Sequence, residues 1–249
     1  MSKPRIDILT LFPEYFEGPF TVSIVKRAVA KKALEIKLHQ LRDWADDKHH
    51  TTDDVPYGGG AGMVMKPEPL MKAMADIKKG RKKVRTIFLS PQGKKFDQAT
   101  AQRLSKEKAL LFVCGHYEGL DERVMGKIDE EISLGDFVLT GGEPAAAVIV
   151  DALVRFLPGV VGDQESVEKD SFFNGLLDYP HYTRPRSYRG MDVPEVLLNG
   201  NHAHIERWRR KESLKNTLLK RPDLLEKASL TEGDRKLLIE IEKEIQTGK

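Results

Sequence analysis

Cysteine is nearly absent from this sequence, since Cys114 is the only one among 249 residues. A single cysteine excludes an internal disulfide framework and any metal site that needs several cysteines. Cys114 stands in the apolar run LLFVCG, an environment in which a free thiol behaves as a small apolar side chain. The sequence therefore predicts a buried thiol on a strand.

Long apolar runs are missing as well. No stretch approaches the roughly 18 consecutive apolar residues that identify a membrane-spanning helix. The first residues, MSKPRIDILTLFP, contain too short an apolar core for a signal peptide. We expect a soluble, cytoplasmic protein with no membrane partner.

A strong excess of one charge is also lacking, because the formal net charge is +3. The charges are unevenly distributed, however. Residues 184–221 contain ten Lys and Arg against four Asp and Glu, whereas residues 222–249 contain five against seven. A local basic stripe in a nearly neutral chain suits phosphate contacts, but solvated helix faces have the same composition. Charge alone leaves both interpretations open.

What the sequence does contain is an alternation of apolar runs with helical segments. Continuous apolar strands that alternate with helices predict a buried parallel sheet, and hence an α/β fold. The predicted strands lie at 5–12, 34–41, 84–90, 109–115 and 131–139, and the predicted helices at 20–33, 67–79, 96–107, 121–128 and 143–156.

The pattern changes after Gly162. Residues 163–180 are polar and irregular, and beyond Pro194 the spacing is helical without a strand. We predict an α/β domain over residues 1–161, a flexible linker over 162–175 and a smaller all-helical domain over 176–249.

Three predicted strands end in unusual turns, which read LSPQG at 89–93, CGHYEG at 114–119 and LGDFVLTGG at 134–142. In the last turn a strand-like run, Phe137-Val138-Leu139, stops at two glycines, and a helix begins at Glu143-Pro144. A strand, a glycine turn and a helix N-terminus together typically hold a nucleotide-like ligand. Ligands lie off the carboxyl ends of parallel strands, so the three turns are expected to converge on one site.

Neither common nucleotide fingerprint accompanies these turns: GxGxxG does not follow the first strand, and GxxxxGK[ST] does not occur. Main-chain groups of such turns can instead hydrogen-bond an adenine and a ribose. The simpler alternative is that glycine and proline merely end the strands.

The turns occur within a series of longer motifs. In order along the chain these are YGGGAGMVMKPEP, LSPQG, GHYEGLDERV, SLGDFVLTGGEPAA and DYPHYTRP. This series resembles the bacterial tRNA (guanine-N1)-methyltransferases, the TrmD family, over essentially the whole chain. The resemblance implies a SPOUT methyltransferase domain with a deep trefoil knot, which ordinary chain-threading rules would not predict.

The resemblance also implies a methyl donor, S-adenosylmethionine, held bent among the three turns. A ligand of this kind has no phosphate, which explains why no phosphate fingerprint is present. The positions that correspond to the cofactor shell are Leu89, Ser90, Gly115, Tyr117, Glu118, Ser133, Leu134, Gly135, Asp136, Phe137, Val138, Leu139, Gly141, Gly142 and Pro144.

For catalysis, the resemblance implies Asp170 in EKDSFFNG as the base that removes the N1 proton of guanine, and Arg155 in DALVRFLPG as the cation beside O6. It implies magnesium as a further requirement, with ligands that we cannot assign. It also implies a homodimer with a shared active site, and the anticodon stem-loop of tRNA as the partner of the helical domain.

Two clusters have competing interpretations. The segment HHTTDD at 49–54 imitates a metal site, but adjacent histidines on a loop point in different directions. In HAHIERWRRK at 202–211, Trp208 suits core packing better than base stacking, and the arginines suit phosphate contacts.

Three alternative functions are an RNA-binding module without catalysis, a related knotted RNA methyltransferase with another target atom, and a nucleotide-dependent oxidoreductase. The convergent turns argue against the first alternative. The linker acid and the HYTRP segment favour guanine N1 over the second, and the missing fingerprint disfavours the third.

Overall fold

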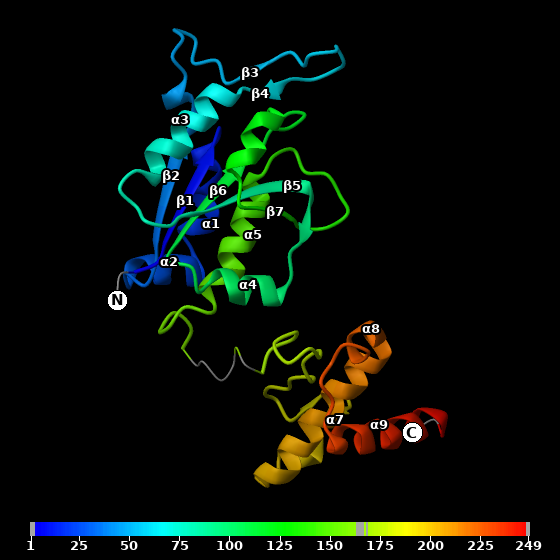
Figure 1. The fold of residues 1–249 in the computed structure, drawn as a ribbon. Coiled ribbons are helices and arrows are strands. Elements are labelled where there is room, and N and C mark those ends of the chain that lie inside the picture. The colour runs from blue at the N-terminus through cyan, green and yellow to red at the C-terminus, as the bar shows by residue number, and fades with distance from the viewer. Residues whose placement is uncertain (1–2, 163–166, 168, 248–249) are drawn as a thin grey trace. The chain divides into compact units, whose positions relative to one another are not determined.

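The computed structural model of the chain describes residues 3–162, 167 and 169–247 (Figure 1). The chain divides into two compact units, Met1–Gly162 and Asp163–Lys249, which we call unit 1 and unit 2 and describe separately. Residues 163–166 and 168 of the predicted linker lie outside the described residues. None of the described helices combines the length and the apolar composition needed to cross a membrane.

Unit 1 is built on a five-stranded sheet in which every pairing is parallel. The strand order is β2-β1-β6-β5-β7, so the three strands that end in the predicted ligand turns are neighbours. The strands are β1 (Arg5–Thr10), β2 (Glu35–Gln40), β5 (Arg85–Lys95), β6 (Ala109–Cys114) and β7 (Glu130–Ser133).

The sheet is covered on both faces, as continuous apolar strands require. On β6, Leu110 and Phe112 belong to one buried cluster and Leu111 and Val113 to another, because successive side chains point to opposite faces. Helices α2, α4 and α5 contribute to the first cluster, and α3 to the second. The predicted parallel α/β fold is therefore confirmed.

The helices and short elements of unit 1 occupy the connections between these strands (Figure 1). They are η1 (Pro13–Phe16), α1 (Glu17–Phe20), α2 (Ser23–Ala30), η2 (Leu41–Trp44), β3 (Asp53–Asp54), β4 (Val64–Met65), α3 (Pro67–Lys78), α4 (Gln98–Leu104), η3 (Glu122–Lys127) and α5 (Glu143–Val154). The predicted helix at 121–128 is thus a 3-10 helix, and the one at 20–33 is divided between α1 and α2.

One strand prediction was wrong. Phe137, Val138 and Leu139 do not continue β7 but lie in an exposed loop. The Ser133 hydroxyl accepts a hydrogen bond from the Gly135 amide (3.1 Å) and donates one to its carbonyl (3.0 Å), and the Phe137 amide then donates to that carbonyl (2.9 Å). These local bonds satisfy the backbone without a neighbouring strand, so the ladder ends at Ser133.

Unit 2 consists mainly of helices, as predicted, and has a small core around Leu214 and Ile241. It also contains a short antiparallel hairpin that the sequence did not predict. Its elements are β8 (Ser187–Tyr188), β9 (Met191–Asp192), η4 (Glu195–Leu197), α7 (His202–Lys220), α8 (Pro222–Leu225) and α9 (Glu232–Gln246). The trefoil knot implied for unit 1 stays a prediction.

Candidate active site

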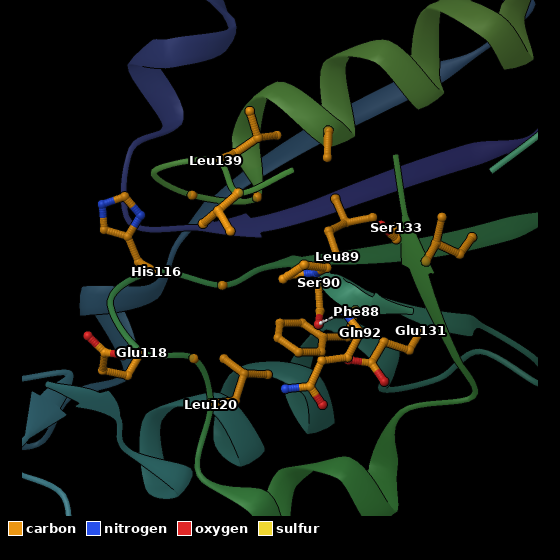
Figure 2. A pocket seen from close by; sticks show the side chains of 18 of the residues that line it. Phe88, Leu89, Ser90, Gln92, His116, Glu118, Leu120, Glu131, Ser133 and Leu139 are labelled. Atoms are coloured by element: carbon orange, nitrogen blue, oxygen red, sulfur yellow. Dashed lines mark hydrogen bonds between the residues drawn. The ribbon is translucent and has the colours of Figure 1, made fainter. Parts of the chain in front are cut away.

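A cavity of about 370 Å³ lies at the carboxyl ends of β5, β6 and β7 (Figure 2). Its walls come from the three turns that the sequence singled out, together with η3 and the first turn of α5. Because β6 and β5 lie side by side in a parallel sheet, Leu89 pairs with Cys114, and both predicted turns follow this pair. The predicted end of β5 was wrong, however: after a break in register between Leu89 and Lys94, β5 pairs with β7 again as far as Lys95. The expected convergence of the turns is confirmed.

Most of the expected cofactor residues line this cavity. They are Leu89, Ser90, Gly115, Tyr117, Glu118, Ser133, Leu134, Phe137, Val138, Leu139, Gly141 and Gly142. Gly135, Asp136 and Pro144 are next to lining residues in the chain but do not themselves line the cavity. Whether these residues bind a cofactor stays a prediction.

Other lining residues were not selected from the sequence. Pro91, Gln92, His116, Gly119 and Thr140 stand inside the quoted turns, so a signal for them existed. Three more stand in the longer quoted motifs GHYEGLDERV and SLGDFVLTGGEPAA, namely Leu120, Glu122 and Ala145. The rest come from strands β5 and β7 or from η3 and carry no signal of a ligand site: Phe88, Met125, Glu131 and Ile132.

The glycine turn before α5 packs directly on the turn after β6. The Gly142 amide donates to the Gly115 carbonyl (2.9 Å), and His116 and Gly141 form an isolated antiparallel bridge. A side chain on Gly142 would place its Cβ 2.7 Å from the Cα of Cys114. This close approach of two main chains explains why the position is glycine.

A buried carboxylate directly follows the same glycine turn in the chain. Glu143, the first residue of α5, is 3% exposed, and one carboxylate oxygen, Oε1, accepts a hydrogen bond from the hydroxyl of Thr10 on β1 (2.6 Å). The helix N-terminus favours this negative charge. Burial, together with the charge of Glu143, raises the pKa of Cys114 well above its usual value, and the predicted buried thiol is confirmed.

The glycine run after HHTTDD reaches the cavity wall. The Glu118 amide donates to the Met63 carbonyl (3.0 Å), and the Met65 amide donates to the Gly119 carbonyl (2.9 Å). Any side chain on Gly62 would collide with the Glu118 side chain. The segment around 58–65 is therefore part of the site's support.

Tyr117 occupies a strained position in this turn. Its φ of +56° lies in the left-handed region, which residues other than glycine rarely adopt. Burial and the nearby carboxylate of Asp53 raise the pKa of its phenol. Such strain is often found at ligand-binding turns.

The charges around the cavity have one sign. Glu118, Glu122 and Glu131 line it, and its lining in the described structure includes neither lysine nor arginine. In Figure 2, Glu118 and Glu131 lie on opposite sides of the drawn lining. An acidic lining suits a cationic ligand and disfavours a phosphate.

The two expected catalytic residues lie outside this lining. Arg155 is half-buried and follows the last residue of α5, whereas the cavity touches the first turn of that helix. At about 1.5 Å per residue, Ala145 and Arg155 are roughly 15 Å apart along the axis. Asp170 belongs to unit 2, where its Oδ1 accepts from the Ser171 amide (2.9 Å).

The amino-acid sequence of the chain matches that of a known family. The family model for tRNA (guanine-1)-methyltransferase TrmD matches residues 4–227. The chain belongs to the TrmD family. The family that the sequence motifs predicted is thereby confirmed, and TrmD proteins are methyltransferases.

Relatives within the TrmD family are similar over nearly their whole length. A tRNA (guanine-N(1)-)-methyltransferase of Dictyoglomus turgidum is 59% identical over 242 residues, which cover 97% of this chain and 98% of that protein. One of Dehalococcoides mccartyi is 56% identical over 239 residues (95% and 96%). One of Geobacter metallireducens is 55% identical over 239 residues (96% and 98%).

The segment HHTTDD, whose sequence imitates a metal site, makes local hydrogen bonds instead. The His50 ring bonds the Arg42 carbonyl (3.0 Å), and Asp47 accepts from the Thr51 amide (2.8 Å). Across the described part of the chain, no group of three or more His, Cys, Asp or Glu side chains is placed to hold a metal ion. The predicted magnesium therefore has no assigned ligand.

The basic stripe expected to contact phosphate lies largely on α7. Several of its cations face the acids of α9: Arg207 pairs with Glu240 (2.8 Å), and Arg210 with Asp234 (2.7 Å). Trp208 is partly buried and lies 6.3 Å from the ring of Tyr182, between centroids. Part of the stripe thus stabilises unit 2 itself.

Proposed function

We propose that this chain transfers a methyl group from S-adenosylmethionine to N1 of the guanine immediately 3′ of the anticodon in tRNA, a modification that prevents frameshifting. The observation that carries the proposal is an acidic cavity, built from three main-chain turns, in a chain of the TrmD family. Close relatives named tRNA (guanine-N(1)-)-methyltransferase favour guanine N1 over other target atoms.

The cavity residues fit the proposed methyl donor. Volumes of about 300–1,000 Å³ are typical of small-molecule sites, and the cavity lies within that range. Apolar side chains such as Phe88 and Leu134 suit an adenine ring, while the three glutamates suit the positive sulfonium and ammonium groups. When bound, the cofactor supplies an electrophilic methyl group.

The protein's task is then to make guanine N1 nucleophilic. Asp170 accepts the N1 proton, and its carboxylate can also face the exocyclic amine, an arrangement that guanine offers. A free Asp has a pKa of about 3.9, so Asp170 alone is a weak base for this proton. Arg155 facing O6 stabilises the negative charge that develops there and makes the N1 proton more acidic.

The position of Arg155 supports a site shared by two copies of the chain. Within one chain it is separated from the cavity by nearly the full length of α5, roughly 15 Å. Its helix is otherwise almost wholly apolar, yet Val148 in its middle is 51% exposed. A second copy packed on this helix covers Val148 and brings one chain's Arg155 to the other chain's cavity.

Single-turnover methylation of a saturating tRNA transcript tests these roles. Asp170→Asn keeps the shape of the side chain but loses the base, so its rate falls about 10²–10⁴-fold. Arg155→Ala also loses rate, and Arg155→Lys recovers only part because it lacks the planar fork. The two losses are less than additive because each group's effect depends on the other.

S-adenosylmethionine binding, measured by calorimetry, is retained in all these variants because other residues form its cavity. A near-normal single-turnover rate for Asp170→Asn contradicts the assignment of the base. Binding of ATP as tightly as S-adenosylmethionine contradicts the assignment of the cofactor.

The shared site has its own experiment. Chains with Asp170→Ala are mixed with chains damaged at Gly142, so that each pure species is inactive. Mixed dimers contain one intact combination and regain part of the activity. No recovery in mixed dimers argues for a site within one chain.

A further inference from the structure

The amino ends of the sheet, opposite the cavity, carry a concentration of positive charge. In the register of the sheet, Arg5 pairs with Ala109 and Arg85 with Leu110, so the connections that lead into β6 and β5 end side by side, next to the start of β1. The connection before β5 reads KKGRKKV and the one before β6 reads SKEK. Five lysines in them are exposed, and we call them the amino-edge lysines: Lys79, Lys82, Lys83, Lys106 and Lys108.

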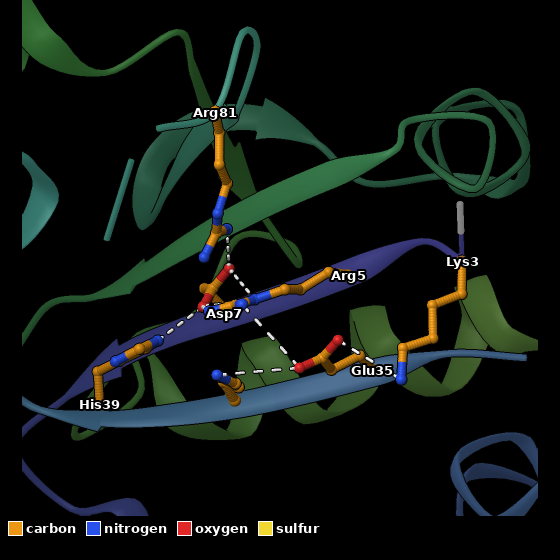
Figure 3. A network of polar contacts seen from close by, with 7 residues as sticks. Lys3, Arg5, Asp7, Glu35, His39 and Arg81 are labelled. Atoms are coloured by element: carbon orange, nitrogen blue, oxygen red, sulfur yellow. Dashed lines mark hydrogen bonds and ion pairs between the residues drawn. The ribbon is translucent and has the colours of Figure 1, made fainter. Parts of the chain in front are cut away.

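Four carboxylates of this edge, those of Asp7, Glu35, Glu107 and Glu130, are already engaged by other cations, and Figure 3 shows the first two. Asp129 instead accepts a hydrogen bond from the Thr86 amide (2.7 Å). Asp7 is fully buried and binds Arg81 (2.6 Å), Arg5 (2.6 Å) and His39 (2.7 Å). Glu35 lies within 4.0 Å of Lys3, Arg5 and Lys37, while Glu107 pairs with Arg85, and Glu130 with Arg85 and Arg103. Among the described residues, none of the amino-edge lysines has an ion-pair partner.

The Asp7 network also fixes the loop that carries three of these lysines. Burial opposes the charge on Asp7, but hydrogen bonds from His39, Arg5 and Arg81 outweigh it and hold the pKa of this carboxyl well below its usual range. Arg81 is thereby tied inward, while Lys82 and Lys83 next to it stay exposed. The lysines therefore project from an anchored loop.

Like charges crowd at the start of this loop. Burial lowers the pKa of Lys78, the carboxylate of Asp129 partly restores it, and the ammonium of Lys127 lowers it again. Repulsion between Lys78 and Lys127, which Asp129 offsets only in part, destabilises a fold, and an anionic partner relieves it.

We propose that the amino-edge lysines form a second RNA-binding surface, which contacts the phosphate backbone of a base-paired stem of the tRNA outside the anticodon stem-loop. The segments 78–85 and 103–109 contain no aromatic residue on which unpaired bases could stack. Lysines act as point charges for phosphates, and phosphate contacts carry no sequence information. A duplex is therefore the form of RNA that fits.

The surface is within reach of an RNA that also enters the cavity. β6 has six residues, and at roughly 3.3 Å per residue the amino edge and the cavity are about 20 Å apart. The cations on α7, in contrast, are partly used by the acids of α9. This proposal rests on the proposed function in one respect, which is that the RNA bound by the lysines is tRNA.

The test replaces three lysines of the anchored loop with glutamine, Lys79→Gln, Lys82→Gln and Lys83→Gln. Its matched control changes Lys26, Lys48 and Lys72 in the same way; these are three exposed lysines of unit 1 that belong neither to the amino-edge lysines nor to the cavity lining. Binding of full-length unmodified tRNA, of an isolated anticodon stem-loop and of a plain RNA duplex of about 16 base pairs is measured at several salt concentrations.

For the loop variant, we expect the Kd for full-length tRNA to rise about tenfold and the slope of log K against log salt to fall by about 2–3 units. The Kd for the plain duplex rises in parallel, whereas the Kd for the anticodon stem-loop and its single-turnover methylation rate are unchanged. The control triple variant binds all three RNAs like the unaltered protein.

The proposal is overturned if the loop variant binds full-length tRNA with the affinity and the salt slope of the unaltered protein. It is also overturned if the control variant loses as much affinity as the loop variant. A loss that appears equally with the anticodon stem-loop also overturns it, because the lysines then serve the catalytic cleft. Failure of the unaltered protein to methylate the stem-loop counts against the proposed function, and the binding comparison still decides the role of the lysines.

Discussion

Gly142→Ala tests whether the packing of two main chains shapes the cavity. The added Cβ would lie 2.7 Å from the Cα of Cys114, and 3.1 Å from both the Cβ of Cys114 and the amide nitrogen of Gly115. Because the nearest of these atoms belongs to the backbone of a buried strand, the glycine turn must move instead. The movement stretches the 2.9 Å hydrogen bond from the Gly142 amide to the Gly115 carbonyl.

This displacement sets the size of two effects, the loss of stability and the loss of affinity for S-adenosylmethionine. Overpacking of a close-packed interior costs about 1–3 kcal/mol, and a domain of this size loses roughly 2–4 °C in Tm for each kcal/mol. A wall displaced by a large fraction of an ångström also loses its hydrogen-bond geometry with the ligand. We expect the Kd for S-adenosylmethionine to rise by about tenfold, because a lost hydrogen bond costs about 0.5–1.5 kcal/mol and each step of about 1.4 kcal/mol is a factor of ten.

Calorimetry and thermal unfolding measure the two effects on the same sample. The control is Gly126→Ala in η3, where an added Cβ meets no atom within 4 Å. A Gly142→Ala protein with unchanged affinity, or a Gly126→Ala protein with an equal loss, refutes the reasoning. If Gly142→Ala does not fold, Gly141→Ala replaces it, because there the new Cβ would meet the side chains of Glu143 and His116.

Two further predictions concern stability. Thr10→Val removes the hydroxyl that donates to the buried carboxylate of Glu143 (2.6 Å), so the free energy of unfolding falls by about 1–3 kcal/mol. Thr10→Ser keeps the hydroxyl, and its free energy of unfolding stays near that of the unaltered protein. Urea titrations measure both variants, and an equal loss for both contradicts the role of this bond. Hydrogen bonds from Arg210 hold the pKa of Asp234 well below its usual range, so this stabilisation is complete above the unfolded value of about 3.9 and is lost as pH falls below it. Unfolding of unit 2 followed between pH 6 and pH 2 should show this loss, and Asp234→Asn should remove that part of the pH dependence.

Much of the fold could be predicted from the sequence because its signals are local. Runs such as ALLFVCG are apolar at every position, which requires a strand buried on both faces, and the structure places β6 at the centre of the sheet. Phe137, Val138 and Leu139 give the same local signal but have no neighbouring strand to pair with. Apolar composition therefore predicted a strand where the sheet had already ended.

The sequence predicted those cavity residues whose residue type and place at a strand end both indicate a ligand-binding turn. Glycine turns mark strand ends, so Gly115, Gly141 and Gly142 could be selected directly. Glu131 could not, because it stands within β7 and no turn distinguishes it. Glu122 stands in the quoted motif GHYEGLDERV but outside its glycine turn, so it was not selected. Asp170 and Arg155 came from family resemblance, since neither a turn nor a spacing distinguishes them.

Four glycines line the cavity: Gly115, Gly119, Gly141 and Gly142. At these positions the protein presents its main chain, whose amides and carbonyls stay the same whichever amino acid is encoded. An inhibitor that hydrogen-bonds these groups contacts a surface that most single substitutions leave unaltered. Substitutions that do alter it, as at Gly142, disturb the binding of S-adenosylmethionine to a similar degree, so a variant that escapes such a compound also loses activity.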